Sequence, residues 1–93
     1  MALFVIVCKD KPGALETRMA TRPTHLDYLN GAGLVKVAGP LLDDAGSPIG
    51  SLLIIEAEDK AAAQAFADND PYTLAGLFES AEVHPWRVGV GSL

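Results

Sequence analysis

The residues of this sequence best suited to move a proton are His25 and Asp70. An imidazole can give or take a proton near neutral pH, and a carboxylate bonded to one ring nitrogen leaves the other nitrogen available to a substrate. His25 is adjacent to Leu26 and four residues from Leu29, so on a helix it lies on or beside the buried face. A histidine that only packs in the core fits the same position, and the spacing does not separate the two interpretations.

Asp70 stands in the segment Asp68-Asn69-Asp70-Pro71-Tyr72, which is typical of a helix end followed by a turn. A residue that precedes proline is driven out of helical geometry into an extended conformation. In that conformation the Asp70 carboxylate could cap the next turn through a backbone amide, or it could reach a neighbouring imidazole. Asp68 is expected only to end the helix.

Arg22 precedes His25 by three residues, which makes the two side chains neighbours on a helix. A guanidinium makes paired hydrogen bonds to a carboxylate, so Arg22 is a candidate anion anchor beside the histidine. A surface ion pair with Glu16 or Asp27 is the simpler alternative.

The segment His84-Pro85-Trp86-Arg87 is a second cluster of polar and aromatic residues. We expect Trp86 in the core or lining a cleft and Arg87 against a substrate or a partner subunit. His84 is expected to be exposed to solvent.

Other kinds of site are disfavoured. Cys8 lies in an apolar stretch, where a buried and inert thiol is expected, and a single cysteine without a disulfide favours a reducing cytoplasm. One cysteine and two histidines at no ligand spacing predict no metal site. Gly31 and Gly33 lack the third glycine and the preceding strand of a dinucleotide site, so no cofactor is expected.

Composition narrows the class of protein further. The chain has 93 residues, of which 49% are hydrophobic and 20% charged, and this predicts one packed domain over residues 1–93. The net charge of −5, with the cationic side chains scattered, argues against nucleic-acid binding. The longest apolar run, Ala2 to Cys8, is far too short to span a bilayer.

Turn-forming residues divide the chain into four strands and two main helices. The expected strands are Leu3–Lys9, Leu34–Leu42, Ile49–Ala57 and Glu79–Val90, the last interrupted near Pro85. The expected helices are Leu15–Ala32 and Lys60–Ala67, the second capped by Asp59, with one further helical turn over Thr73–Phe78.

The first helix contains Pro23, which lacks an amide donor and clashes with the preceding turn. The sequence therefore predicts a short first turn, then a helix that restarts with Thr21 as its N-cap and Pro23 in its first turn. The predicted core-facing residues of this segment are Leu15, Met19, Leu26 and Leu29.

The element order β-α-β-β-α-β predicts an α+β, ferredoxin-like fold. Two helices cover only one face of a four-stranded antiparallel sheet, yet the first and third strands are apolar at nearly every position. Side chains alternate between faces along a strand, so the second face also needs cover. We expect a homodimer through that sheet face, because most soluble oligomers are two-fold homodimers. A monomer with a twisted sheet and an apolar surface is the alternative.

Several short motifs occur in an order and spacing typical of one family. They are Asp10-Lys11-Pro12-Gly13, Arg22-Pro23-x-His25-Leu26-x-x-Leu29, Gly39-Pro40-Leu41, Asp68-x-Asp70-Pro71-Tyr72, Gly76-Leu77-Phe78 and Val83-x-Pro85-Trp86. With these motifs the sequence resembles the YCII (YciI-like) family over essentially its whole length. The resemblance implies a dimeric ferredoxin-like α/β barrel whose active site is a His–Asp pair, and motif matching places that pair at His25 and Asp70.

Characterised members of that family look like small-molecule lyases, among them a dehydrochlorinase of chlorinated hydroxyquinols in aromatic degradation. The resemblance therefore implies a cofactor-free lyase, or else an isomerase, for a small aromatic substrate. In the lyase reaction His25 would take a hydroxyl proton, chloride would leave and a quinone would form. The expected substrate-binding residues are Arg22, Pro40, Tyr72, Trp86 and Arg87. The expected pocket walls are Phe4, Ile6, Leu41, Tyr72, Phe78 and Trp86.

Two other classes of function stay open at this point. A binding or sensing module would hold a small anion in the same cleft without turnover. A structural or regulatory dimer would act through protein partners, and it would need an exposed patch beyond the dimer face.

Overall fold

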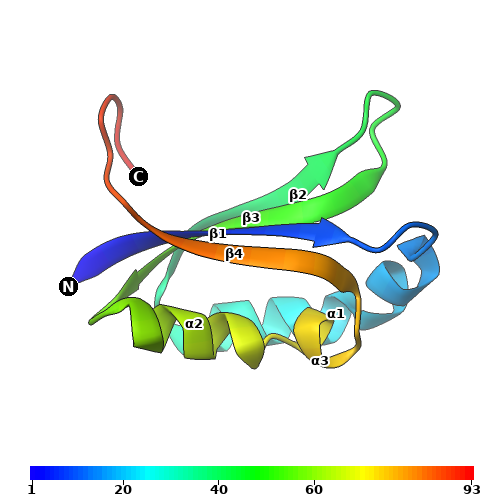
Figure 1. Ribbon diagram of the computed structural model, residues 1–93, viewed down its shortest axis with the longest axis horizontal. Helices are drawn as coiled ribbons and strands as arrows, with labels where there is room; N and C mark the ends of the chain where they lie inside the picture. Colours follow the sequence, from blue (N-terminus) through cyan, green and yellow to red (C-terminus); the bar gives the residue numbers. More distant parts are fainter.

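The computed structural model describes residues 1–93 and contains a four-stranded antiparallel sheet. The strands are β1 (Ala2–Asp10), β2 (Val35–Leu42), β3 (Pro48–Ala57) and β4 (Phe78–Trp86). Their order across the sheet is β2-β3-β1-β4, so the first and last strands of the chain lie side by side (Figure 1).

The helices all lie on one side of this sheet (Figure 1). They are α1 (Leu15–Ala32), α2 (Lys60–Asp68) and the single turn α3 (Pro71–Leu74). The arrangement is the predicted α+β, ferredoxin-like fold, with α3 inserted before the last strand. None of the helices is long and apolar enough to cross a membrane.

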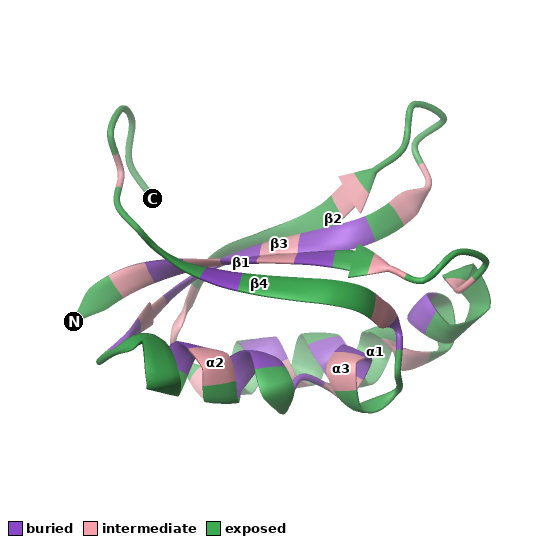
Figure 2. Ribbon diagram, viewed as in Figure 1, coloured by how far each residue is buried: buried purple, intermediate pink, exposed green.

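The core lies between the sheet and the helices (Figure 2). Along β1 the side chains of Phe4, Ile6 and Cys8 are buried while their neighbours are not, which is the alternation of a strand with one covered face. Residues from β3 and α2, including Ile55 and Phe66, complete the core.

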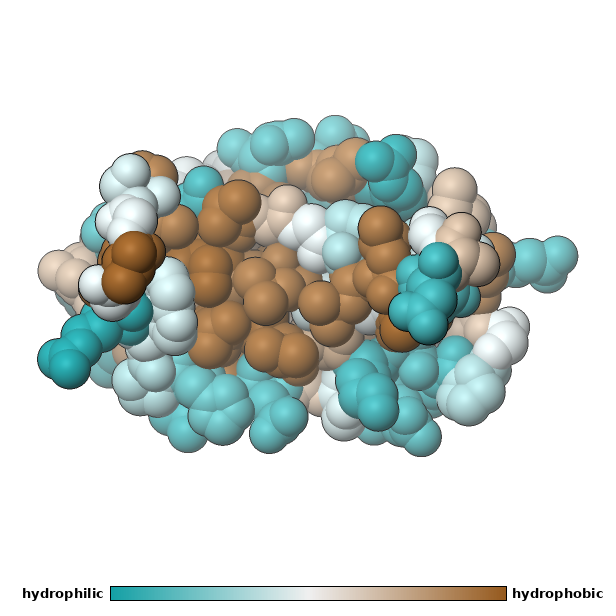
Figure 3. Space-filling view, turned by 90° about the horizontal axis from the view of Figure 1, so that it is seen from above, coloured by the Kyte–Doolittle hydropathy of each residue, from teal (hydrophilic) through white to brown (hydrophobic).

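The other face of the sheet is also largely apolar, and no element covers it. Figure 3 looks onto this face and shows hydrophobic side chains gathered at its centre. Because side chains alternate, the strand residues that point this way are those between the core residues. They include Leu3, Val5 and Val7 on β1, Val37 on β2, Leu52 and Ile54 on β3, and Trp86 on β4.

Two predictions about α1 are wrong. The helix runs without a break through Pro23 and begins after Ala14, so Thr21 is not an N-cap. Pro23 has no backbone N–H, so the carbonyl of Met19 lacks its usual donor within the helix. Met19 is 55% exposed, and water can therefore donate to this carbonyl. Of the predicted core-facing residues only Leu29 is buried, whereas Leu15, Met19 and Leu26 are exposed. The other buried residues of the helix are the polar Arg18 and His25.

After α2, the helical turn and the last strand both have different bounds from those predicted. The extra helical turn is Pro71–Leu74 rather than Thr73–Phe78, because Asp70 caps it, Pro71 occupies its first position and Gly76 (φ 72°) follows it. The last strand is Phe78–Trp86 rather than Glu79–Val90. Pro85 is accommodated inside it because β4 is an edge strand, where a missing amide donor is tolerated.

Candidate active site

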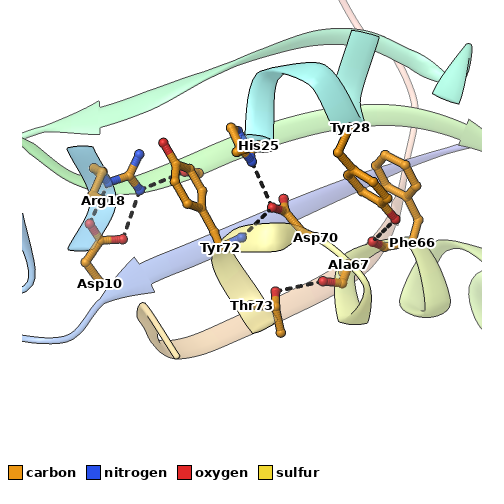
Figure 4. A network of polar contacts seen from close by, with 10 residues as sticks. Asp10, Arg18, His25, Tyr28, Phe66, Ala67, Asp70, Tyr72 and Thr73 are labelled. Atoms are coloured by element: carbon orange, nitrogen blue, oxygen red, sulfur yellow. Dashed lines mark hydrogen bonds and ion pairs between the residues drawn. The ribbon is translucent and has the colours of Figure 1, made fainter. Parts of the chain in front are cut away.

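The structure brings together the imidazole of His25, from α1, and the carboxylate of Asp70, which directly precedes α3 (Figure 4). His25 Nδ1 and Asp70 Oδ1 are 2.8 Å apart, and both residues are buried. A carboxylate oxygen can only accept, so the proton of this hydrogen bond belongs to Nδ1. The lone pair of the neutral ring is therefore on Nε2.

The local sequence around Asp70 explains how its carboxylate is held. Asp70 is extended (φ −60°, ψ 131°), as expected of a residue before proline, and its Oδ1 accepts a hydrogen bond of 2.9 Å from the backbone amide of Tyr72. The two roles considered for this carboxylate, helix cap and imidazole partner, are thus both filled by the same oxygen.

The ring of Tyr72 packs against His25 on one side and Arg18 on the other (Figure 4). The imidazole stacks on the phenol ring with centroids 3.8 Å apart and planes inclined by 16°. The guanidinium carbon of Arg18 lies 4.7 Å from the phenol centroid. Together with the bond to Asp70, this stack fixes the plane of the His25 ring.

Arg18 is a buried cation that sequence reasoning missed. Its Nε and Nη2 donate to the two carboxylate oxygens of Asp10 at 2.7 and 2.9 Å, and Nη2 also donates to the hydroxyl of Ser51 at 2.8 Å. Arg18 stands four residues before Arg22 and seven before His25, so all three share one helical face. That spacing was the signal that could have found it.

The electrostatics of the site keep Arg18 charged and Tyr72 neutral at physiological pH. Burial acts to lower the pKa of Arg18, but its hydrogen bonds to Asp10 and the charge of Asp10 leave that pKa above its usual value. Burial raises the pKa of the Tyr72 phenol, and the nearby charges of Arg18 and Arg22 offset this only in part. A hydrogen bond with the Arg18 guanidinium also acts to lower the pKa of Tyr72, yet burial outweighs it and the phenol stays protonated.

Cys8 fits the expectation of an inert thiol. It is buried in β1, and burial, followed by the negative charge of Asp70, raises the pKa of its thiol to about 12. A protonated thiol is a poor nucleophile.

A pocket of about 300 Å³ lies between α1 and the inner faces of β2 and β3. Its walls include four of the predicted site residues: Arg22, His25, Pro40 and Tyr72. Arg18 and Ser51, which were not predicted, line it as well. Asp70 lies behind the imidazole and is not part of the wall.

The remaining predicted wall residues lie elsewhere. Trp86 is 39% exposed and pairs with Leu3 across the sheet, so its side chain is on the face away from the pocket. Arg87 follows the end of β4 and is exposed, and it does not line the pocket either. Phe4 and Ile6 are core residues, Phe78 packs against the core, and Leu41 does not line the pocket. No three His, Cys, Asp or Glu side chains are grouped so as to hold a metal ion.

Comparison with known proteins adds to this geometry. The model of the YCII-related domain matches residues 2–87. Protein YciI of Escherichia coli O6:H1 is 40% identical over 91% of this chain and 96% of its own length. An uncharacterized protein of Haemophilus influenzae is 33% identical over 90% of this chain and 95% of its own length.

Among solved structures, this chain resembles the 5-chloro-2-hydroxyhydroquinone dehydrochlorinase of Burkholderia phenoliruptrix AC1100 in complex with 2,5-dihydroxybenzoquinone. The TM-score is 0.84 at 40% sequence identity, and the match covers 94% of this chain and 95% of the other. The resemblance thus extends over the elements that carry His25, Asp70 and the pocket.

Proposed function

This chain belongs to the YCII-related family, and from that premise we propose that it is a lyase that removes hydrogen chloride from a hydroxylated, chlorinated aromatic ring. One observation carries the proposal. His25 is fixed through Nδ1 by Asp70, while Nε2 has no partner in the protein and the ring lines a pocket of about 300 Å³. The likeness to a dehydrochlorinase at 40% identity supports this choice of reaction.

In the proposed reaction His25 acts first as base and then as acid. Nε2 takes the proton of a ring hydroxyl and returns it to the carbon that bears chlorine, which converts the phenol into its keto tautomer. A second ring hydroxyl then loses its proton to Nε2 as its electrons form a carbonyl and chloride leaves with the C–Cl electron pair. The net result is one proton and one chloride released, with a quinone as product.

Asp70 and Arg22 have supporting roles in this proposal. Asp70 holds the tautomer in which Nε2 is the base, and its charge stabilises the imidazolium that forms during each transfer. Arg22 is exposed at the pocket wall, where its guanidinium receives the phenolate or the departing chloride. Proton transfer of this kind contributes about 10²- to 10⁴-fold to a rate.

We further propose that the protein is a homodimer through the uncovered face of the sheet. The apolar side chains gathered there, with Val5 and Ile54 near the centre of the sheet, form a continuous patch of the kind that marks a protein interface (Figure 3). Light scattering on the eluting protein is expected to give twice the chain mass of 9.7 kDa. A mass equal to that of one chain would contradict the dimer.

The lyase proposal is tested by measuring chloride release from 5-chloro-2-hydroxyhydroquinone by the wild-type protein and by His25→Ala. We expect release by the wild type and a loss of about 10²-fold or more in the variant, with both proteins folded. Binding of 2,5-dihydroxybenzoquinone without any chloride release by the wild type would instead identify a binding or sensing module. Equal rates in the two proteins would exclude His25 as the proton carrier.

A further inference from the structure

The guanidinium of Arg18 has hydrogen-bond donors that the protein does not use. Asp10 pairs with Nε and Nη2, the side-on arrangement, which leaves Nη1 on the far side of the guanidinium from the carboxylate. None of the hydrogen bonds of Arg18 to Asp10 and Ser51 uses Nη1, although the nearby Tyr72 hydroxyl acts to raise the pKa of the guanidinium. Because no fully buried side-chain nitrogen of the chain lacks a partner, Nη1 must reach open space, and the open space beside Arg18 is the pocket.

Ser51 adds a second donor at the same place. Its hydroxyl accepts the bond from Nη2 of Arg18, so its own proton is free to turn toward another acceptor. The residue is 1% exposed and lines the pocket from β3. Because Ser51 lines the pocket, this proton is available to an acceptor that binds there.

These donors and the catalytic pair lie at different ends of the site. The Tyr72 ring stands between the His25 imidazole and the Arg18 guanidinium (Figure 4). A flat ligand in the pocket can therefore contact Nε2 of His25 with one substituent and the Arg18 end with another. The charge of Arg18 is already balanced by Asp10, so this end favours a polarised oxygen over a free inorganic anion.

We propose that Arg18 and Ser51 form an oxygen-binding subsite, which receives a ring hydroxyl or carbonyl oxygen while His25 acts on a second oxygen of the same ring. The proposal rests on the lyase function above and narrows its substrate class to rings with at least two oxygen substituents. As a ring hydroxyl becomes a quinone carbonyl, these fixed donors stabilise the charge that passes through that oxygen.

The test is isothermal titration of 2,5-dihydroxybenzoquinone into the wild type, Ser51→Ala and Tyr28→Phe. Ser51→Ala is expected to weaken binding about 3- to 10-fold, the worth of one hydrogen bond. Tyr28→Phe removes a hydroxyl that does not line the pocket, so its affinity should equal that of the wild type. Equal affinities for Ser51→Ala and the wild type, or no binding to the wild type, would overturn the subsite.

A second variant tests Arg18 itself. Arg18→Lys keeps a cation beside Asp10 but loses the planar group that reaches Asp10, Ser51 and the pocket together. Binding of the quinone should weaken at least as much as in Ser51→Ala. Circular dichroism checks that the variant is folded. If it is not folded, the affinity of Ser51→Ala alone tests the subsite.

These binding outcomes do not depend on turnover. Chloride release without any effect of Ser51→Ala on affinity would remove the subsite and leave the lyase. Weakened binding in Ser51→Ala together with no chloride release would keep the subsite and remove the lyase.

Discussion

Two aromatic stacks beneath the sheet are built alike and differ in one respect. Tyr28 stacks on Phe66 with centroids 4.8 Å apart, and Tyr72 stacks on His25 at 3.8 Å, with nearly parallel rings in both. In the first stack the only polar group, the Tyr28 hydroxyl, donates 2.8 Å to the Phe66 carbonyl. In the second, Nε2 of His25 and Nη1 of the adjoining Arg18 have no partner in the protein (Figure 4).

The difference in unused polar groups indicates that the two stacks have different roles, one in packing and one in chemistry. Both Tyr28 and His25 belong to α1, three residues apart. The Tyr28 stack satisfies its own polar group and so contributes only to stability. The His25 stack keeps donors and acceptors unused at a pocket, where a ligand can bind them.

Among the substitutions that test the contrast between the two stacks, we expect Asp70→Asn to have the largest effect on turnover. The amide cannot stabilise an imidazolium, so kcat should fall on the order of 10²-fold while KM changes little. Steady-state chloride release measures both parameters, and the melting temperature reports the cost of altering the cap of α3. Asp68→Asn is the matched control, since this exposed carboxylate two residues earlier only accepts a bond from Gln64.

Comparable kcat values for Asp70→Asn and Asp68→Asn would show that the His25 stack is no more than packing. The contrast between the two stacks would then have no catalytic meaning.

Tyr28→Phe is expected to have a smaller effect, on stability and not on turnover. The Phe66 carbonyl loses its donor while the ring stack remains, so the free energy of unfolding should fall by about 1 kcal/mol, with turnover unchanged. Urea denaturation gives the first quantity and chloride release the second. A loss of turnover with unchanged stability would reverse the roles assigned to the two stacks.

Much of the fold was predictable because the strands follow a simple physical rule. Buried Phe4 and Ile6 alternate with half-exposed neighbours, and the turn residues between elements fix the order β-α-β-β-α-β. The continuity of α1 was not predictable in this way. Local propensity penalises Pro23, and only tertiary packing of the remaining helix overrides that penalty.

The candidate site was predicted in part, and Arg18 is the main residue that the prediction lacks. Asp70 and His25 were found from residue chemistry and from the family resemblance, although 45 positions separate them. The apolar periodicity of α1 predicts a buried face that includes Leu15 and Met19, whereas the helix buries Arg18 and His25 and leaves both of those residues exposed. The buried face of α1, which lines the pocket, is therefore not the one that the apolar periodicity predicts.

The most direct test of the central claim, that His25 carries the proton, is chemical rescue. The space left in His25→Ala can admit a free imidazole next to Asp70. Chloride release by this variant should be low without imidazole and should rise to a plateau as imidazole is added, with no comparable rise for the wild type. Wild-type rates for His25→Ala in the absence of imidazole would contradict the account.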